Sequence, residues 1–315
     1  MKNLKLHSSL CLIFGIVLIL TSCKEKSLDN SETLAIDTVE KEAQAPKRQL
    51  NQEFKDYWYN GTAEITSYSL EQARYGEIRE GNAVMIFVTE PFLPGLQVKA
   101  DTKDSSNIPV LKLNATKNYI TGIYPYSIMT SSFYPVYDNQ HALKLSFSSQ
   151  EWCGHVYAQL NNRDDFEIMS HSYFGSEADQ DYHLGKANLE NEIWNKIRIN
   201  PANLPIGKLT MIPSLEFIRL THKELKAYEA ITTLTKADDI NTYEITYPDL
   251  ERTLKINFRS EFPYTIESWM DTYKDGFGEK AKVLTSTATI INRITTPYWK
   301  QNSNKDLSLR DSLGL

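Results

Sequence analysis

The chain has 315 residues, of which 34 are lysine or arginine and 40 are aspartate or glutamate, giving a formal net charge of −6 at neutral pH. This acidic balance, with no visible basic patch, excludes DNA and RNA as expected partners. The segment of about 260 residues after position 53 is long enough to bury one large core or two smaller ones.

The first 22 residues have the pattern of an export signal. Lys2 and Lys5 supply a positive start, and residues 10–20 are almost wholly apolar. This run is shorter than the roughly 20 residues that a membrane-spanning helix needs. We therefore expect residues 1–22 to be a cleaved signal peptide.

The four residues Leu20-Thr21-Ser22-Cys23 resemble the lipobox that bacterial lipoprotein signal peptidase recognises. This resemblance implies that Cys23 becomes the first residue of the mature chain and carries the lipid. Several acyl chains hold a protein stably on a membrane, because each buried methylene contributes about 0.8 kcal/mol. The membrane is thus one expected partner, through a lipid anchor at Cys23. The alternative is an ordinary signal peptide with an accidental cysteine.

The localisation expected from this signal is the cell envelope, with the protein anchored in the outer membrane and facing the periplasm. Exposure at the cell surface is the alternative, because acidic residues that follow the cysteine act as a sorting signal in some lipoproteins. Residues 23–52 are polar and poor in aromatic side chains, which predicts a flexible tether.

Loss of Lys2 and Lys5 with the signal lowers the net charge to about −8. Loss of Cys11 and lipidation of Cys23 leave Cys153 without a disulfide partner.

Residues 53–303 are expected to form a mainly β (α+β) domain: a large, curved, antiparallel sheet or half-barrel with one principal helix. Aromatic and β-branched residues alternate with polar ones between turn signals. The expected strands are Thr62–Leu70, Ala83–Thr89, Ile108–Asn114, Tyr119–Met129, His141–Phe147, Glu151–Leu160, Phe166–Tyr173, Lys208–Ile212, Leu215–Thr221, Ala227–Lys236, Thr242–Tyr247, Thr253–Arg259, Thr265–Tyr273 and Lys282–Ile294.

The principal helix is expected at Leu184–Ile199, where apolar residues recur at helical spacing before Pro201. If the domain has two lobes, their boundary is expected near 201–213. Residues 304–315 are expected to form a polar C-terminal tail.

The run from Glu151 to His155 is the densest cluster of chemically capable side chains. In a strand, Cys153 and His155 point to the same face about 7 Å apart, with Glu151 on that side too. A thiolate beside an imidazole is the central pair of cysteine hydrolases. These three residues are therefore weak catalytic candidates, and a polar pocket cluster or a purely structural role is the alternative.

Aromatic residues around two prolines are the candidate ligand-binding groups: Tyr124, Tyr126, Tyr134 and Tyr137. They can line a groove for a lipid, a sugar or a protein segment, or pack in the core. A second polar group, around His171 and His183, matches no metal signature, so no metal site is expected.

Several common motifs are absent from the sequence. It has no Gly-rich phosphate loop, no His-Glu-x-x-His, no Gly-x-Ser-x-Gly and no Cys-x-x-Cys. No cofactor is therefore expected.

Three features of the chain resemble uncharacterised Bacteroidota lipoproteins: the Gln150–His155 run, the Trp194–Pro201 helix end and Cys23. Some of these lipoproteins carry the label septum formation inhibitor Maf. The label implies a cytosolic nucleotide pyrophosphatase with a Ser-x-Ser-x-Arg-Arg motif, whereas this chain has an export signal and lacks the motif. The Thr253–Tyr273 strand pair and the single helix also look like the curved half-barrels of lipoprotein carriers. That resemblance implies a concave apolar face able to hold an acyl chain.

Together these features predict a lipid-anchored envelope protein that binds a hydrophobic or extended ligand, or a partner protein, without catalysis. One alternative is a thiol-dependent hydrolase or transferase that uses Cys153 and His155. Another is a structural subunit of an envelope complex.

Overall fold

The computed structural model of the protein describes residues 48–315 except 103 and 139. The predicted signal peptide, Cys23 and the tether up to residue 47 lie outside the described residues. Residues 48–52, assigned to the tether from sequence, are attached to the domain. The Arg48 main-chain N–H donates to the Tyr137 carbonyl (2.8 Å), and its guanidinium group donates to the Val136 carbonyl (3.0 Å).

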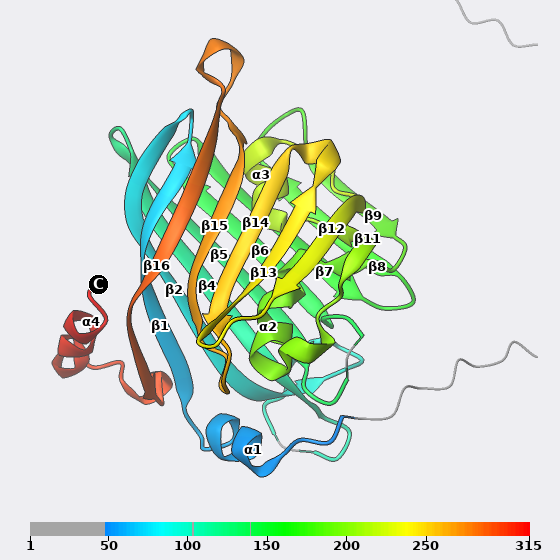
Figure 1. Ribbon diagram of the computed structural model, residues 1–315, viewed down its shortest axis with the longest axis vertical. Coiled ribbons are helices and arrows are strands. Elements are labelled where there is room, and N and C mark those ends of the chain that lie inside the picture. The colour runs from blue at the N-terminus through cyan, green and yellow to red at the C-terminus, as the bar shows by residue number, and fades with distance from the viewer. Residues whose placement is uncertain (1–47, 103, 139) are drawn as a thin grey trace, which may run out of the picture. The chain divides into compact units, whose positions relative to one another are not determined.

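The described chain folds into one large, curved, unclosed antiparallel sheet, as the sequence predicted (Figure 1). Its strands are β1 (Ala63–Arg74), β2 (Glu77–Leu93), β3 (Val98–Lys99), β4 (Ile108–Thr121), β5 (Tyr124–Pro135), β6 (Lys144–Glu151), β7 (Gly154–Asn162), β8 (Phe166–Ser172), β9 (Asp179–Leu184), β10 (Asn188–Leu189), β11 (Gly207–Ile212), β12 (Tyr228–Thr235), β13 (Ile240–Tyr247), β14 (Arg252–Arg259), β15 (Ile266–Asp275) and β16 (Lys282–Thr296).

Two runs of neighbouring strands make up this sheet. Strands β1 to β9 form one run, with β3 beside β2, and strands β10 to β16 form the other. The first and last strands of the chain, β1 and β16, pair with each other and join the two runs. The free edges are therefore β9 and β10, and only residues 185–187 connect them.

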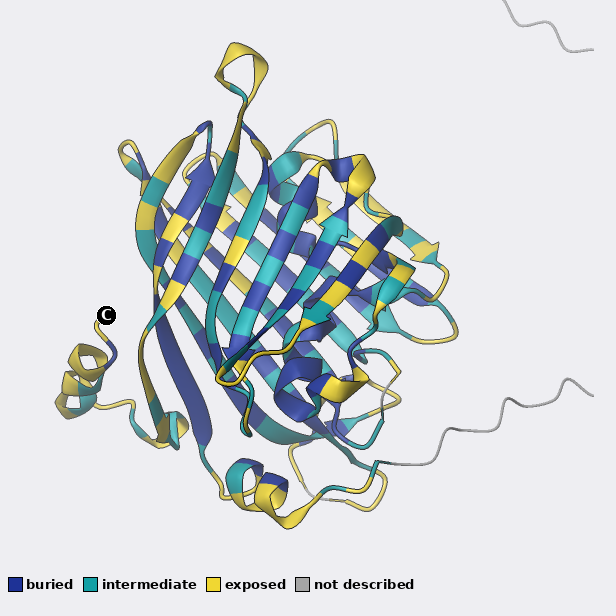
Figure 2. Ribbon diagram, viewed as in Figure 1, coloured by how far each residue is buried: buried dark blue, intermediate teal, exposed yellow. Residues whose placement is uncertain are grey.

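Irregular pairing adds to the curvature of the sheet. The register of β1 on β16 shifts between Ser67 and Tyr68, and that of β14 on β15 shifts between Asn257 and Phe258. Such bulges bend a strand and increase its twist. The curved sheet encloses the core on its concave side, as the dark bands along the strands in Figure 2 show.

The strand alternation seen in the sequence matches the observed burial. In β13, Tyr243, Ile245 and Tyr247 are fully buried, and the residues between them are partly exposed. Successive side chains of a strand point to opposite faces, so one face of β13 lies in the core and the other faces solvent.

Four α-helices and five 3₁₀ turns complete the described chain. The helices are α1 (Gln52–Trp58), α2 (Glu190–Ile199), α3 (Leu215–Thr221) and α4 (Ser308–Ser312). The 3₁₀ turns are η1 (Pro201–Asn203), η2 (Pro248–Leu250), η3 (Gly278–Lys280), η4 (Tyr298–Lys300) and η5 (Asn304–Asp306). Among the described residues, no helix has the length and apolar character to cross a bilayer.

The predicted helix at 184–199 exists but is shorter. It begins at Glu190, because Leu184 ends β9 and residues 188–189 form β10. It packs inside the concave face of the sheet, and nine of its ten residues are buried. An amphipathic helix that lies on a surface keeps one face in water. Here the charged residues of α2 are buried as well.

The strand predicted at Leu215–Thr221 is wrong, because this segment is helix α3. The Ser214 side chain accepts a hydrogen bond from the Phe217 main-chain N–H (3.2 Å) and so caps the first turn. His222, with φ near +54°, ends the helix in the left-handed conformation. The sequence does contain a helix-start signal, because Ser214 directly follows Pro213. The prediction of a strand instead followed the apolar residues of the segment.

No lobe boundary interrupts the sheet at 201–213. Strand β11 pairs with β10 on one side and with β12 on the other. The segment 304–315, predicted as a polar C-terminal tail, packs on the domain. It contains α4, Leu313 is buried, and the Ser67 hydroxyl donates to the Leu313 carbonyl (2.5 Å).

Candidate functional site

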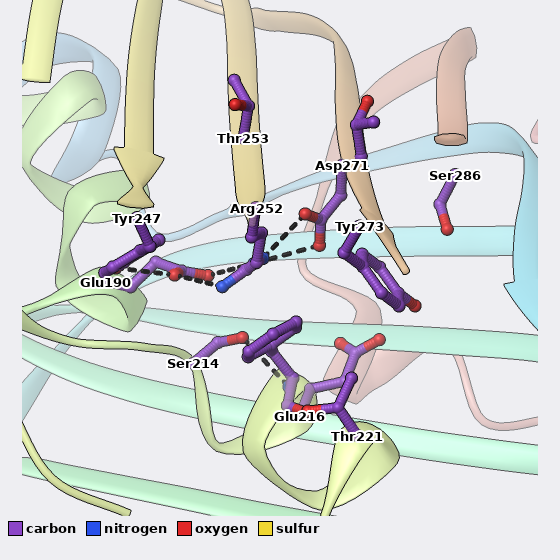
Figure 3. A network of polar contacts seen from close by, with 12 residues as sticks. Glu190, Ser214, Glu216, Thr221, Tyr247, Arg252, Thr253, Asp271, Tyr273 and Ser286 are labelled. Atoms are coloured by element: carbon purple, nitrogen blue, oxygen red, sulfur yellow. Dashed lines mark hydrogen bonds and ion pairs between the residues drawn. The ribbon is translucent and has the colours of Figure 1, made fainter. Parts of the chain in front are cut away.

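An arginine at the centre of the concave interior is shared by two carboxylates (Figure 3). The Arg252 guanidinium group donates to both oxygens of Glu190, at 2.7 and 2.8 Å. It also donates to both oxygens of Asp271, at 2.8 and 3.0 Å. The Tyr247 hydroxyl donates a further bond to Glu190 (2.9 Å). Helix α2 and strands β13, β14 and β15 thus meet in one polar network.

The two ends of this network differ in electrostatics. Burial raises the pKa of Asp271 above its ordinary value, and the positive charge of Arg252 opposes this shift without cancelling it. Burial and the charge of Glu190 raise the pKa of Tyr247 well above its ordinary value, so the tyrosine stays a neutral donor. The α3 residue Phe217 covers the network, with its ring centroid 4.0 Å from the guanidinium carbon of Arg252.

A small cavity lies beside this network. Its volume is about 70 Å³, and its walls include a second ion pair, between Lys117 and Glu216 at 2.7 Å. Trp194 and Trp269 form part of its apolar wall. Ligand pockets usually measure about 300–1,000 Å³, so this cavity has room for a few water molecules and not for an acyl chain.

Two larger clefts lie on either side of helix α3. The α3–β9 cleft has a volume of about 450 Å³ and is lined by α3, by residues 222–226 and by strands β6 to β9. The α3–β15 cleft has a volume of about 500 Å³ and is lined by α3, η2 and the end of β15. Both are large enough for a small molecule or one alkyl chain.

The α3–β9 cleft continues the apolar core to the surface. Phe147, Val156 and Ala158 belong to the core cluster and line this cleft. Leu184, Leu215 and Ile218 add apolar surface from the edge strand and from α3. The strand edge at β9 leaves this part of the core uncovered by any further strand.

The wall of the α3–β15 cleft contains a buried arginine. Arg74, the last residue of β1, is only 3% exposed and lines this cleft. Its guanidinium group donates to the Leu220 carbonyl at the end of α3 (2.7 Å) and to the Tyr126 hydroxyl (3.2 Å). Asp249 and Glu251 lie at the mouth of the same cleft.

The catalytic candidates from sequence are placed at a tight turn, and not along one strand. Glu151 pairs with Gly154 between β6 and β7, so Trp152 and Cys153 form the turn and the expected strand at Glu151–Leu160 begins only at Gly154. The Tyr173 ring packs so closely against the main chain at position 154 that only glycine fits there, because a Cβ on Gly154 would lie 2.6 Å from this ring.

The expected thiol–imidazole pair is not formed among the described residues. Cys153 and His155 are both exposed, and no hydrogen bond joins their side chains. The Glu151 carboxylate instead accepts from the Cys153 main-chain N–H (2.7 Å) and raises the pKa of the Cys153 thiol. A raised pKa disfavours the nucleophilic thiolate.

The four candidate tyrosines do not share one groove. Tyr124 and Tyr126 lie at the start of β5, next to Arg74, and Tyr134 lies at its other end with Tyr137 just beyond. Tyr126 and Tyr134 are buried, and the other two are partly exposed. Only the Tyr124–Tyr126 pair is near the clefts beside α3.

The histidines of the second polar group form exposed ion pairs. His171 contacts Asp179 at 3.1 Å, and His183 contacts Asp165 at 2.9 Å. Within the described residues, no cluster of three or more side chains is arranged to hold a metal ion.

Sequence reasoning missed the residues that form the interior network and the cleft walls. Arg252 and Glu190 are 62 positions apart, and Arg74 meets Leu220 across 146 positions, so no local pattern links either pair. Comparisons with known proteins add no further guide, because no family model, curated protein or solved structure matches the chain significantly.

Proposed function

We propose that the protein is a lipid-anchored cell-envelope protein that binds a hydrophobic or extended ligand in the α3–β9 cleft and catalyses no reaction. The observation that carries this proposal is the cleft itself, about 450 Å³ in volume, whose floor is formed by buried core side chains of β6 and β7. The lipobox at Leu20–Cys23 supports the envelope location.

The physical argument rests on uncovered apolar surface. Each Å² of apolar surface that a ligand covers contributes roughly 25 cal/mol to binding, before ordering costs. The small interior cavity cannot supply this surface. In the α3–β9 cleft, the partly exposed Tyr182 and Leu184 of the edge strand β9 supply it, at an edge where a chain can enter from solvent. The buried Phe147 and Val156 form the floor beneath them.

A neutral hydrophobic probe tests the proposal directly. The full chain with Cys23→Ser, which cannot be acylated, is titrated with N-phenyl-1-naphthylamine, and the probe fluorescence is followed. Ser170 lines the cleft from β8, so Ser170→Phe fills it and is expected to weaken binding by roughly tenfold or more.

The matched control is Met169→Phe, one position earlier on the same strand. Met169 is 44% exposed and points to the opposite face of β8, so this variant should bind the probe like the parent chain. Absence of probe binding by the parent chain, or equal weakening by both variants, contradicts a ligand site in this cleft.

A further inference from the structure

One buried arginine of the described chain lacks the carboxylate partner that the others have. Arg74, Arg198 and Arg252 are the three buried arginines among the described residues, each at most 3% exposed. Arg198 forms a bidentate pair with Glu64, at 2.5 and 2.6 Å, and Arg252 binds two carboxylates. Arg74 forms no ion pair with any described carboxylate. A buried charge without a counter-charge is unfavourable, so Arg74 requires another explanation.

The partners that Arg74 does have are neutral. The Leu220 carbonyl accepts from it at 2.7 Å, and the Tyr75 and Tyr126 hydroxyls lie within 3.4 Å. The carbonyl end of α3 supplies a partial negative charge, which offsets only part of a full positive charge. With a further contact from Nε to the Tyr126 hydroxyl at 3.4 Å, these bonds engage four of the five N–H groups of the guanidinium and leave one.

A second arginine, Arg219 on α3, lines the α3–β9 cleft, across the helix from Arg74. Its side chain is 10% exposed, and its Nε has no hydrogen-bond partner among the described residues. Its one carboxylate contact is with Glu177, at 3.5 Å, and that carboxylate binds His222 more closely, at 2.6 Å. Arg219 therefore has spare donor capacity at the edge of the apolar cleft.

Basic and acidic side chains both line the two clefts around these arginines. Burial lowers the pKa of Arg219, and the nearby charge of Arg74 lowers it further. Lys223 lines both clefts and forms no ion pair with the described residues. Of the carboxylates that line the clefts, Glu177 binds Arg219 and His222, Glu224 binds Lys226, and Asp275 accepts from the Gly76 N–H at 2.6 Å. Asp249 and Glu251, at the mouth of the α3–β15 cleft, form no ion pair with the described residues.

A further unsatisfied donor lies next to Arg74. The Tyr119 hydroxyl is buried without a hydrogen-bond partner among the described residues, and its ring stacks on Tyr126 with centroids 5.0 Å apart. Buried donors are normally satisfied in folded proteins. Two arginines with spare donors and a free hydroxyl, set around the end of α3, are suited to oxygens that the protein itself does not supply.

We propose that Arg74 and Arg219 bind the anionic headgroup of an amphiphile, a carboxylate or a phosphate, whose alkyl chain occupies the α3–β9 cleft. This inference rests on the proposed function and adds the chemical class of the ligand. Arginine binds both kinds of oxyanion with charge-assisted hydrogen bonds. Arg219 lines the α3–β9 cleft, and Arg74 lines the α3–β15 cleft on the other side of α3. The two clefts approach each other at the end of this helix, where Lys223 lines both and Arg74 contacts the Leu220 carbonyl.

The test compares ligands that differ only in the headgroup. The full chain with Cys23→Ser carries N-phenyl-1-naphthylamine, and displacement is measured with dodecyl phosphate, laurate, dodecanol and inorganic phosphate. Dodecyl phosphate and laurate are expected to displace the probe at concentrations roughly 10- to 100-fold lower than dodecanol, the range of charge-assisted hydrogen bonds. Inorganic phosphate should not displace it.

The variants assign the effect to these side chains. Arg74→Gln and Arg219→Gln should each weaken the two anionic ligands roughly tenfold or more and leave dodecanol unchanged, and Arg219→Lys should restore part of the loss. Arg259→Gln is the control, because Arg259 pairs with Glu267 at 2.7 Å and lines neither cleft. If Arg74→Gln does not fold, the headgroup site is tested with Arg219→Gln and with the salt dependence of the parent chain. Added salt should weaken the binding of the anionic ligands and leave the binding of dodecanol unchanged.

The outcomes separate this inference from the proposed function. Equal displacement by dodecanol and dodecyl phosphate, unaffected by the arginine variants, overturns the headgroup site and leaves the hydrophobic site intact. Calorimetry that finds inorganic phosphate bound as tightly as dodecyl phosphate overturns the amphiphile and leaves a free-anion site. Failure of the probe to bind at all overturns the proposed function.

Discussion

The two helices inside the curved sheet lie in regions that treat buried charge in opposite ways. Around α2, the charges of Arg198 and Arg252 are matched by carboxylates, and the adjoining cavity is small. Around α3, Arg74 has no carboxylate partner, Arg219 has a distant one, and two clefts reach the surface. Matched charges fit a structural role, and unmatched charges beside a cleft fit a site that a ligand completes.

Helices α2 and α3 also differ in length, burial and contacts, in agreement with a structural role for the first region and a binding role for the second. Helix α2 has ten residues, nine of them buried, and its charged side chains bind Glu64 of β1 and Arg252 of β14, which in turn binds Asp271 of β15. Helix α3 has seven residues and separates the interior cavity from both clefts. The α2 region is therefore expected to dominate stability, and the α3 region to dominate binding.

The largest expected effect tests the α2 region, where the buried arginines are paired with carboxylates. Glu64→Gln removes the carboxylate that pairs with Arg198, where both side chains are 1% exposed. Breaking a buried pair from one side costs roughly 3–5 kcal/mol, because an uncompensated charge remains. Urea unfolding followed by tryptophan fluorescence measures this loss. The control Glu267→Gln breaks an exposed pair with Arg259 and should cost under about 1 kcal/mol. An equal loss of unfolding free energy in the two variants would contradict the structural role assigned to the buried Glu64–Arg198 pair.

A smaller effect distinguishes two carboxylates within the matched region by pH. Burial raises the pKa of Glu64, but the charge and hydrogen bonds of Arg198 outweigh it, so the pKa lies below its ordinary value of 4.5. The stability from Glu64 is therefore present above pH 4.5 and lost as the pH falls. Asp271 has the opposite sign: its raised pKa gives a contribution that is present below pH 3.8 and lost as the pH rises.

Two variants make these opposite slopes measurable. The cost of Glu64→Gln in unfolding free energy should grow between pH 3.5 and pH 7, and the cost of Asp271→Asn should shrink over the same range, as about one pKa unit corresponds to 1.4 kcal/mol. Urea titrations at four pH values measure both costs. Slopes of the same sign for the two variants contradict the assigned balance of burial and charge.

The smallest expected effect concerns the turn between β6 and β7, which holds the catalytic candidates predicted from the sequence. The Glu151 carboxylate raises the pKa of the exposed Cys153 thiol, so the rate of alkylation by iodoacetamide should have its midpoint above pH 9. Glu151→Gln should lower that midpoint, and His155→Gln should leave it unchanged, as measured by mass spectrometry of the alkylated chain. A midpoint near pH 7 that His155→Gln abolishes would instead restore the thiol–imidazole pair.

The sequence was most informative where a local pattern decides the structure. Residues Thr253–Phe258 alternate between apolar and polar, and they form β14 with one buried face. The apolar spacing around Ile193 and Ile197 indicated α2. Leu215–Thr221 was misread, because a short segment with apolar residues at 215, 217, 218 and 220 fits either a strand or a helix. Its Ser214 cap decided for the helix.

By itself, the sequence determined that the described chain is mainly β and antiparallel, because this follows from composition and short-range periodicity, and it predicts an export signal with a lipobox at Cys23. Only the tertiary structure decided which charges are matched. Pairing of β1 with β16 brings residues more than 200 positions apart side by side. The same folding places Glu64 on Arg198 and leaves Arg74 at the end of α3 without a carboxylate. Such long-range contacts depend on how the strands are ordered in the sheet, which no local pattern encodes.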